Sequence, residues 1–137
     1  MIHLKEKKAF ITGGTKGIGF GIAQSLLQEG ISVVITGRTE ESVQKATSEL
    51  TSLAKSNNAK VLVIVADVRD YEQMESAAKN ALENMGSIDL VIANAGLGHF
   101  APVHQLSVEQ WHETINTNLN GVFYTLKVFA QSLMEHQ

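Results

Sequence analysis

The sequence predicts an α/β fold in which helices cover both faces of a parallel sheet. Two observations support this prediction. Short apolar runs rich in β-branched residues alternate with longer segments of helical period, and Gly, Asp, Asn or Lys bound each run. The alternation reads βαβαβαβα over residues 1–137, without a linker, low-complexity tract or internal repeat. Right-handed crossovers place such a chain in one doubly wound sheet.

Four strands are expected where Val, Ile, Leu and Ala follow one another without polar alternation. They are Ala9–Thr12, Ser32–Thr36, Val61–Ala66 and Leu90–Ala93. Such runs are typical of parallel strands that are buried on both faces. Four helices are expected from apolar residues spaced three or four apart. They are Gly17–Gln28, Glu40–Ala54, Asp70–Met85 and Ser107–Glu135.

Residues at the helix ends support these assignments. Gly30 and Gly86 follow the first and third helices, and Ser107 is the expected N-cap of the last. The last helix is also expected to present one apolar face. Its members are Trp111, Ile115, Leu119, Val122, Leu126, Phe129 and Leu133.

Composition excludes several classes of protein. The 11 Lys and Arg against 14 Asp and Glu give a net charge of −3, which disfavours binding to nucleic acid or an anionic membrane. The longest apolar run, Val61–Ala66, is far shorter than the ~20 residues that cross a bilayer. The chain has no Cys, and its His residues lack metal-ligand spacing, so no metal site is expected. The N-terminus lacks the apolar segment of a signal peptide, so we expect a cytoplasmic protein.

A glycine-rich turn, residues 12–19, joins the first strand to the first helix. Gly13, Gly17 and Gly19 are spaced G-x-x-x-G-x-G, which matches neither G-x-G-x-x-G nor a P-loop, where Lys would replace Phe20. A turn of this kind lets the backbone approach a pyrophosphate, and the helix N-terminus offers it free N–H groups. Tight packing of the helix on the strand is the alternative explanation of the glycines.

Together with three later motifs, this turn resembles the short-chain dehydrogenase/reductase family. The motifs are Thr12-Gly13-x-x-x-Gly17-Ile18-Gly19, Asp67-Val68, Asn94-Ala95-Gly96 and Asn118-Leu119-x-Gly121. They occur in the family's order and cover nearly the whole chain. The resemblance implies a Rossmann-type sheet with strand order 3-2-1-4 in the part present. It also implies an NAD(P)-dependent oxidoreductase that interconverts a ketone and a secondary alcohol, closest to the 3-oxoacyl-[acyl-carrier-protein] reductases.

The resemblance assigns the dinucleotide-binding residues by position. The backbone of the turn would face the pyrophosphate, with Ile18 packing below the nicotinamide end. Asp67 would accept a hydrogen bond from the adenine amino group; its alternative role is a helix N-cap, which Asp70 already fills. Asn94 would bond the central strands and border the ribose, although Ala93 stands where the family commonly has Asn. The residues expected on this basis are Gly13, Thr15, Lys16, Gly17, Ile18, Gly19, Asp67, Val68, Asn94, Ala95 and Gly96.

The stretch after the second strand, Thr36-Gly37-Arg38-Thr39, bears on the choice between NADP and NAD. It lacks the carboxylate that binds a ribose 2′-hydroxyl about 20 residues beyond the glycines. Arg38, beside Thr39, can instead hold a 2′-phosphate through two hydrogen bonds, and Lys16 supplies a second cation. Because a basic residue at either place accompanies NADP in the family, we expect NADP(H) to be preferred over NAD(H). Two solvated surface cations are the alternative.

Of the family's four catalytic residues, the resemblance identifies only Asn118, which would hold a water in the proton relay. An ordinary exposed polar residue is the alternative. The family's Ser and Tyr-x-x-x-Lys have no counterpart, since Tyr71 is followed at +4 by Glu75 and Tyr124 by Val128. We therefore expect residues 1–137 to be the incomplete, cofactor-binding N-terminal half of the domain, inactive alone. A non-catalytic dinucleotide-binding module, acting as a sensor or scaffold, is the alternative function.

Partners also follow from the resemblance. The expected substrate is a small carbonyl compound or alcohol, and His99 and Phe100 lie where the family often places substrate-facing residues. The last helix builds a subunit interface in the family, so a homo-oligomer, a dimer or tetramer, is expected of the full-length protein. In the part present, Leu90–Ala93 would form an exposed sheet edge and the last helix would expose apolar side chains.

Overall fold

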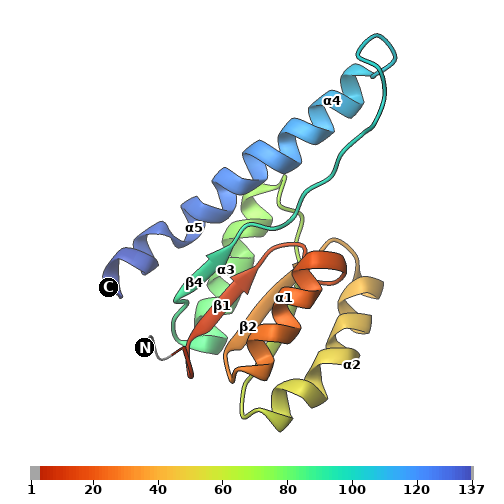
Figure 1. The fold of residues 1–137 in the computed structure, drawn as a ribbon. Helices are drawn as coiled ribbons and strands as arrows, with labels where there is room; N and C mark the ends of the chain where they lie inside the picture. Colours follow the sequence, from red (N-terminus) through yellow and green to blue (C-terminus); the bar gives the residue numbers. More distant parts are fainter. Residues whose placement is uncertain (1–3, 137) are drawn as a thin grey trace.

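The computed structural model describes residues 4–136 and contains one parallel sheet with the strand order β3-β2-β1-β4 (Figure 1). The strands are β1 (Lys8–Ile11), β2 (Ser32–Gly37), β3 (Val61–Val65) and β4 (Leu90–Ile92). In the central register, Phe10 lies beside Val34 on one side and Val91 on the other. The predicted fold class and strand order are confirmed.

Two helical layers cover the sheet (Figure 1). Helices α1 (Gly17–Gln28) and α2 (Glu40–Ser56) pack on the face that carries Ala9 and Ile11. Helix α3 (Tyr71–Met85) and the last helical segment pack on the face that carries Phe10. Because successive strand residues point to opposite faces, one apolar run supplies both cores.

The four predicted strands and the first three predicted helices are confirmed with small shifts of their ends. The first strand covers Lys8–Ile11 rather than Ala9–Thr12, and Thr12 N–H instead donates to Ile92 O at 3.1 Å. The third helix begins at Tyr71 because the Asp70 side chain caps it, accepting from Gln73 N–H at 3.1 Å. Ser107 caps the last helix, and Gln110 completes a reciprocal capping box.

The prediction of one regular last helix is wrong. Helix α4 (Val108–Ile115) passes into a π-helical turn, η1 (Asn116–Asn120), before α5 (Gly121–Glu135) begins. In a π turn the backbone hydrogen bonds join residues five apart instead of four, and such turns are common at functional sites. Sequence periodicity does not detect it, because the helical hydrogen-bonding pattern changes without a break in the helix.

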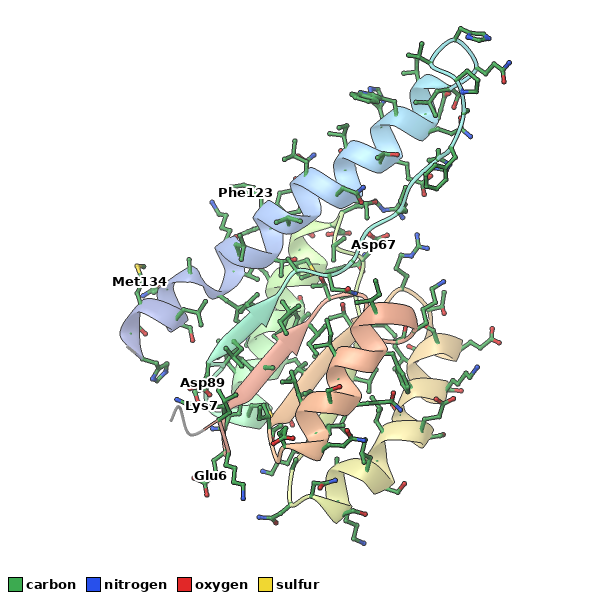
Figure 2. All side chains as sticks on the ribbon, in the orientation of Figure 1. Glu6, Lys7, Asp67, Asp89, Phe123 and Met134 are labelled. Atoms are coloured by element: carbon green, nitrogen blue, oxygen red, sulfur yellow. The ribbon has the colours of Figure 1, made fainter. Side chains whose placement is uncertain are left out.

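The predicted apolar face of this helix is also wrong in part. Trp111, Leu119 and Leu126 are exposed, whereas Phe129 is fully buried. The buried row is instead Thr117, Gly121, Thr125 and Phe129. A side chain at position 121 would place its Cβ 2.7 Å from Val68 Cγ2, so the helix approaches the body along its small residues. Figure 2 shows Phe123 and Met134 pointing away from the sheet.

Neither a membrane span nor a metal site is found in the part of the chain that the structure describes. None of its helices is long and apolar enough to cross a bilayer. Its His, Asp and Glu side chains form no group of three or more that could hold a metal ion.

Candidate functional site

A pocket of about 470 Å³ lies at the carboxyl ends of the strands. Ligands of open α/β sheets bind at this edge, because the loops after neighbouring strands converge there. Twelve of the thirteen residues expected to bind the cofactor line it: Gly13, Thr15, Lys16, Gly17, Ile18, Arg38, Thr39, Asp67, Val68, Asn94, Ala95 and Gly96. Six further residues line it that the sequence did not single out: Thr36, Gly37, Ser42, Ala66, Leu97 and Thr117. Thr36, Gly37 and Ala66 lie at strand ends, which is the signal that could have identified them.

Hydrogen bonds to the segment after β4 hold the glycine turn in place. The Asn94 side-chain amide donates to Thr12 O and Gly13 O, both at 3.1 Å. Ala95 N–H donates to Thr12 Oγ1, also at 3.1 Å. Asn94 was expected to bond the backbone of the central strands; it instead bonds the two residues that follow β1, and so fixes the turn against the end of β4.

Gly19 does not line the pocket. It is buried beneath the turn, where a Cβ would collide with Asn94 Nδ2 and would lie 2.5 Å from Gly13 O. At this position the packing explanation of the glycines applies, because only a residue without a side chain leaves room for the Asn94 amide. The glycine supports the turn from below.

The N-terminus of α1 opens onto the pocket. Lys16 is its N-cap residue and makes no side-chain capping bond, and the first turn contains no acidic residue. Ile18, in that turn, is 79% exposed and lines the pocket. Free N–H groups and the positive end of the helix dipole suit this end of the pocket to an anion.

Arg38 and Thr39 lie between β2 and α2 at the pocket wall. The Thr39 side chain caps α2 by accepting from Ser42 N–H at 3.2 Å, and the two hydroxyls are 3.0 Å apart. Both hydroxyl protons are already used, since Thr39 Oγ1 donates to Ser42 Oγ and Ser42 Oγ donates to Thr39 O at 2.9 Å. The Arg38 guanidinium is a donor at this wall that suits a phosphate group.

Asp67 is held by Arg69, a contact that the sequence motifs did not indicate. Its Oδ2 accepts from Arg69 Nη2 at 2.6 Å, and its Oδ1 accepts from the Arg69 Nε and backbone N–H groups, both at 3.0 Å. These hydrogen bonds lower the pKa of the Asp67 carboxyl, although its partial burial opposes them; the charge of nearby Arg38 adds to the lowering. Asp67 is therefore an anionic acceptor in the pocket wall. It does not cap α3, because Asp70 fills that position.

Asn118 lies in the π turn and does not line the pocket. Its side chain accepts from Leu97 N–H at 2.9 Å and donates to Leu97 O at 2.7 Å. The amide therefore joins the π turn to the segment after β4, where Leu97 lines the pocket. Both functional ends of the Asn118 side chain have these backbone partners.

A chain of charged and polar contacts continues outward from Asp67. Arg69 Nη1 lies 3.4 Å from Glu113 Oε1, and Glu113 Oε2 lies 2.9 Å from His99 Nε2. Glu113 belongs to α4 and His99 to the segment after β4, so three separate parts of the chain meet here. All four side chains are partly exposed.

Comparison with known proteins gives consistent matches over nearly the whole chain. The sequence model of a family described as short chain dehydrogenase matches residues 7–137. An uncharacterised oxidoreductase of Staphylococcus epidermidis is 32% identical over 135 residues, which are 98% of this chain and 56% of that protein. This chain spans about half the length of the curated relatives that it matches.

Solved structures agree. An alcohol dehydrogenase from the archaeon Thermococcus sibiricus, complexed with 5-hydroxy-NADP, matches with a TM-score of 0.87 and 39% identity, over 94% of this chain and 54% of that one. A 3-ketoacyl-ACP reductase from Sinorhizobium meliloti matches with a TM-score of 0.85 and 35% identity, over 94% of this chain and 49% of that one. This chain therefore belongs to the short-chain dehydrogenase/reductase family, as the match to the family model shows and the relatives and the fold support.

Proposed function

We propose that these residues bind the cofactor in an NADP-dependent oxidoreductase that interconverts a ketone and a secondary alcohol. One observation carries the proposal. Four separate motifs, after β1, β2, β3 and β4, converge on a single pocket at the carboxyl ends of the strands. Each supplies a different recognition group: an open helix N-terminus, a guanidinium, a carboxylate and a polar amide.

The donor set fits a dinucleotide with a 2′-phosphate. The turn from Thr15 to Gly19 would hold the pyrophosphate, and Asp67 would accept from the adenine amino group. Arg38 and Lys16 would hold the 2′-phosphate, with Thr39 beside Arg38 at the pocket wall. The Thermococcus sibiricus relative was solved with an NADP derivative, which supports a nicotinamide dinucleotide as the cofactor.

When bound, the nicotinamide ring supplies or accepts a hydride. The protein's task is then to fix the ring and to manage a proton at the substrate oxygen. In this chain Asn118 serves the first task, because its amide holds Leu97 at the pocket wall. We propose that the π turn around it also holds a water of the proton relay, as the family resemblance implies.

The remaining catalytic groups of the family are a Ser and a Tyr-x-x-x-Lys, which residues 1–137 do not contain. The two tyrosines present pack against each other, with the Tyr71 and Tyr124 ring centres 5.3 Å apart, and neither lines the pocket. We therefore propose that this sequence is the cofactor-binding half of the domain. The chain alone is then expected to show no turnover.

A 3-oxoacyl group on a carrier protein is the proposed substrate class. Its support is the similarity to the Sinorhizobium meliloti 3-ketoacyl-ACP reductase. The second candidate is a non-catalytic dinucleotide-binding module, which would use the same pocket. The coding sequence after Gln137 separates the two, because a Ser followed by Tyr-x-x-x-Lys supports the enzyme and a stop codon favours the module.

We further propose that the full-length protein is a homo-oligomer. Helices α4 and α5, with the π turn η1 between them, expose a group of large apolar side chains: Trp111, Leu119, Phe123, Leu126 and Met134. Such a surface is typical of an interface, and an isologous dimer would bury it twice. Sedimentation of the full-length protein tests this point.

The cofactor preference is tested with Arg38→Ala. Losing a charge-assisted bond to the 2′-phosphate is expected to weaken NADPH binding by about tenfold to a hundredfold, with NADH binding changed less than about threefold. Lys45→Ala, on the exposed side of α2, removes the same charge outside the pocket and is the matched control. Equal losses for the two cofactors would contradict the assignment of Arg38.

A further inference from the structure

The segment after β4, residues 96–106, extends away from the sheet without helix or strand (Figure 1). Leu97 lines the pocket, whereas Phe100 and Val103 are almost fully exposed. In the part of the chain that the structure describes, the side chains of two residues outside this segment form hydrogen bonds with it. Asn118 holds Leu97, and Glu113 holds His99.

Glu113 occupies a central position, since each of its carboxylate oxygens has a different partner. Oε2 lies 2.9 Å from His99 Nε2, and Oε1 lies 3.4 Å from Arg69 Nη1. A carboxylate only accepts hydrogen bonds, so His99 donates through Nε2. Removing this carboxylate would remove both the contact that holds His99 and the second contact of the Arg69 guanidinium.

The same guanidinium holds the carboxylate of Asp67. Both Asp67 oxygens already accept from Arg69. An adenine amino group that binds Asp67 would therefore compete with Arg69 for these oxygens. The other edge of the guanidinium faces Glu113, so a shift of Arg69 would also change its contact with Glu113.

We propose that Glu113 is a positioning residue that couples the adenine end of the pocket to the segment 96–106. This inference rests on the proposed function, which places adenine at Asp67. Ligand binding at Asp67 then changes the order of a segment whose first residues, Gly96 and Leu97, also line the pocket. By linkage, cutting the chain of contacts at Glu113 changes both the segment and the affinity for the adenine end of the ligand.

The test uses Glu113→Gln, which keeps the size of the side chain and removes its charge. The matched control is Glu109→Gln, one turn earlier on α4, where the side chain is exposed and forms no hydrogen bond with another residue in the range 4–136. Hydrogen exchange of peptides covering residues 96–106 is measured with and without adenosine 2′,5′-bisphosphate. Calorimetry gives the affinity for the same compound, and thermal unfolding shows that each variant is folded.

In the unchanged protein, the bisphosphate is expected to alter exchange in residues 96–106. In Glu113→Gln, exchange there is expected to be at least about threefold faster without ligand and insensitive to it, and the affinity to fall by about twofold to tenfold. Glu109→Gln is expected to behave as the unchanged protein. His99→Ala removes the outer contact alone and should reproduce the loss of response.

Three results would overturn the inference. If the bisphosphate binds normally and exchange in residues 96–106 does not respond, the coupling does not exist. If Glu113→Gln responds as the unchanged protein does, Glu113 is not its carrier. If the folded, unchanged protein does not bind the bisphosphate at all, the proposed function fails, and the coupling fails with it; this outcome is distinguishable because it precedes any substitution. If Glu113→Gln is unfolded, His99→Ala decides the question.

Discussion

Replacing Gly19 with Ala is expected to destabilise the protein, whereas replacing Gly21 with Ala in the same helix is expected to stabilise it. A Cβ at position 19 would collide with the Asn94 amide and would lie 2.5 Å from Gly13 O. A Cβ at position 21 meets nothing within 4 Å. The two variants make the same chemical change in one helix, so their difference isolates the packing beneath the glycine turn.

The magnitude follows from three contributions. Ala is preferred over Gly in a helix by about 1 kcal/mol, which favours both variants. At position 19, overpacking costs about 1–3 kcal/mol, and displacing Asn94 loses two hydrogen bonds of about 0.5–1.5 kcal/mol each. Gly19→Ala is therefore expected to lower the free energy of unfolding by about 1–5 kcal/mol, and Gly21→Ala to raise it by up to about 1 kcal/mol.

Urea unfolding followed by circular dichroism measures both values. The Gly19→Ala protein is also expected to lose affinity for NADPH, because the turn and the Asn94 segment move apart. If Gly19→Ala were as stable as Gly21→Ala, the close approach of Asn94 would not constrain this position. The role assigned to Gly19 would then be wrong.

Two further predictions concern the core and the Asp67 carboxylate. Phe129 is fully buried, and its ring centre lies 4.5 Å from that of Phe10. Phe129→Ala is therefore expected to lower the free energy of unfolding in urea by about 3–5 kcal/mol, whereas replacing Phe123, which is 57% exposed, with Ala should lower it by less than about 1 kcal/mol. Equal losses of stability in the two variants would contradict the burial of Phe129. Hydrogen bonds from Arg69 lower the pKa of Asp67 in the folded protein, so its stabilising effect is complete above the unfolded pKa of about 4 and is lost as pH falls through the lowered value. The melting temperature of the unchanged protein should therefore exceed that of Asp67→Asn near pH 7, and the two should become similar in acid. A difference in melting temperature that does not change with pH would exclude this ion pair.

Most of the fold could be predicted from local patterns. A run such as residues 33–35 is apolar on both faces and fully buried, as expected of a central strand between two helical layers. Burial on both faces was wrong for β3 and β4, which are only partly buried because they lie at the edges of the sheet. Asp70 and Ser107 mark helix starts because their side chains satisfy N–H groups that no helix satisfies internally. These signals lie within a few residues of the structure that they determine, so they can be read from the sequence.

The π turn at Asn116–Asn120 could not be predicted, because no local sequence signal distinguishes it from a regular helix. Its consequence is tertiary. Asn118 reaches the backbone of Leu97, 21 residues earlier, and Gly121 lets the helix approach Val68. These contacts determine which face of the last helix is buried. The spacing of apolar residues does not reveal the contacts, and for this reason it placed Trp111 and Leu119 in the core.

The sequence by itself determined the order of the elements, the parallel sheet and the four motifs that follow its strands. It did so because strand burial, helix capping and glycine turns depend on residues close together in the chain. The tertiary structure decided that Gly19 supports the turn rather than lining the pocket. It also decided that Glu113 of α4 contacts both Arg69 and His99. Contacts between side chains from α4 and the loops after β3 and β4 depend on how those elements pack, and neither spacing nor composition encodes that packing.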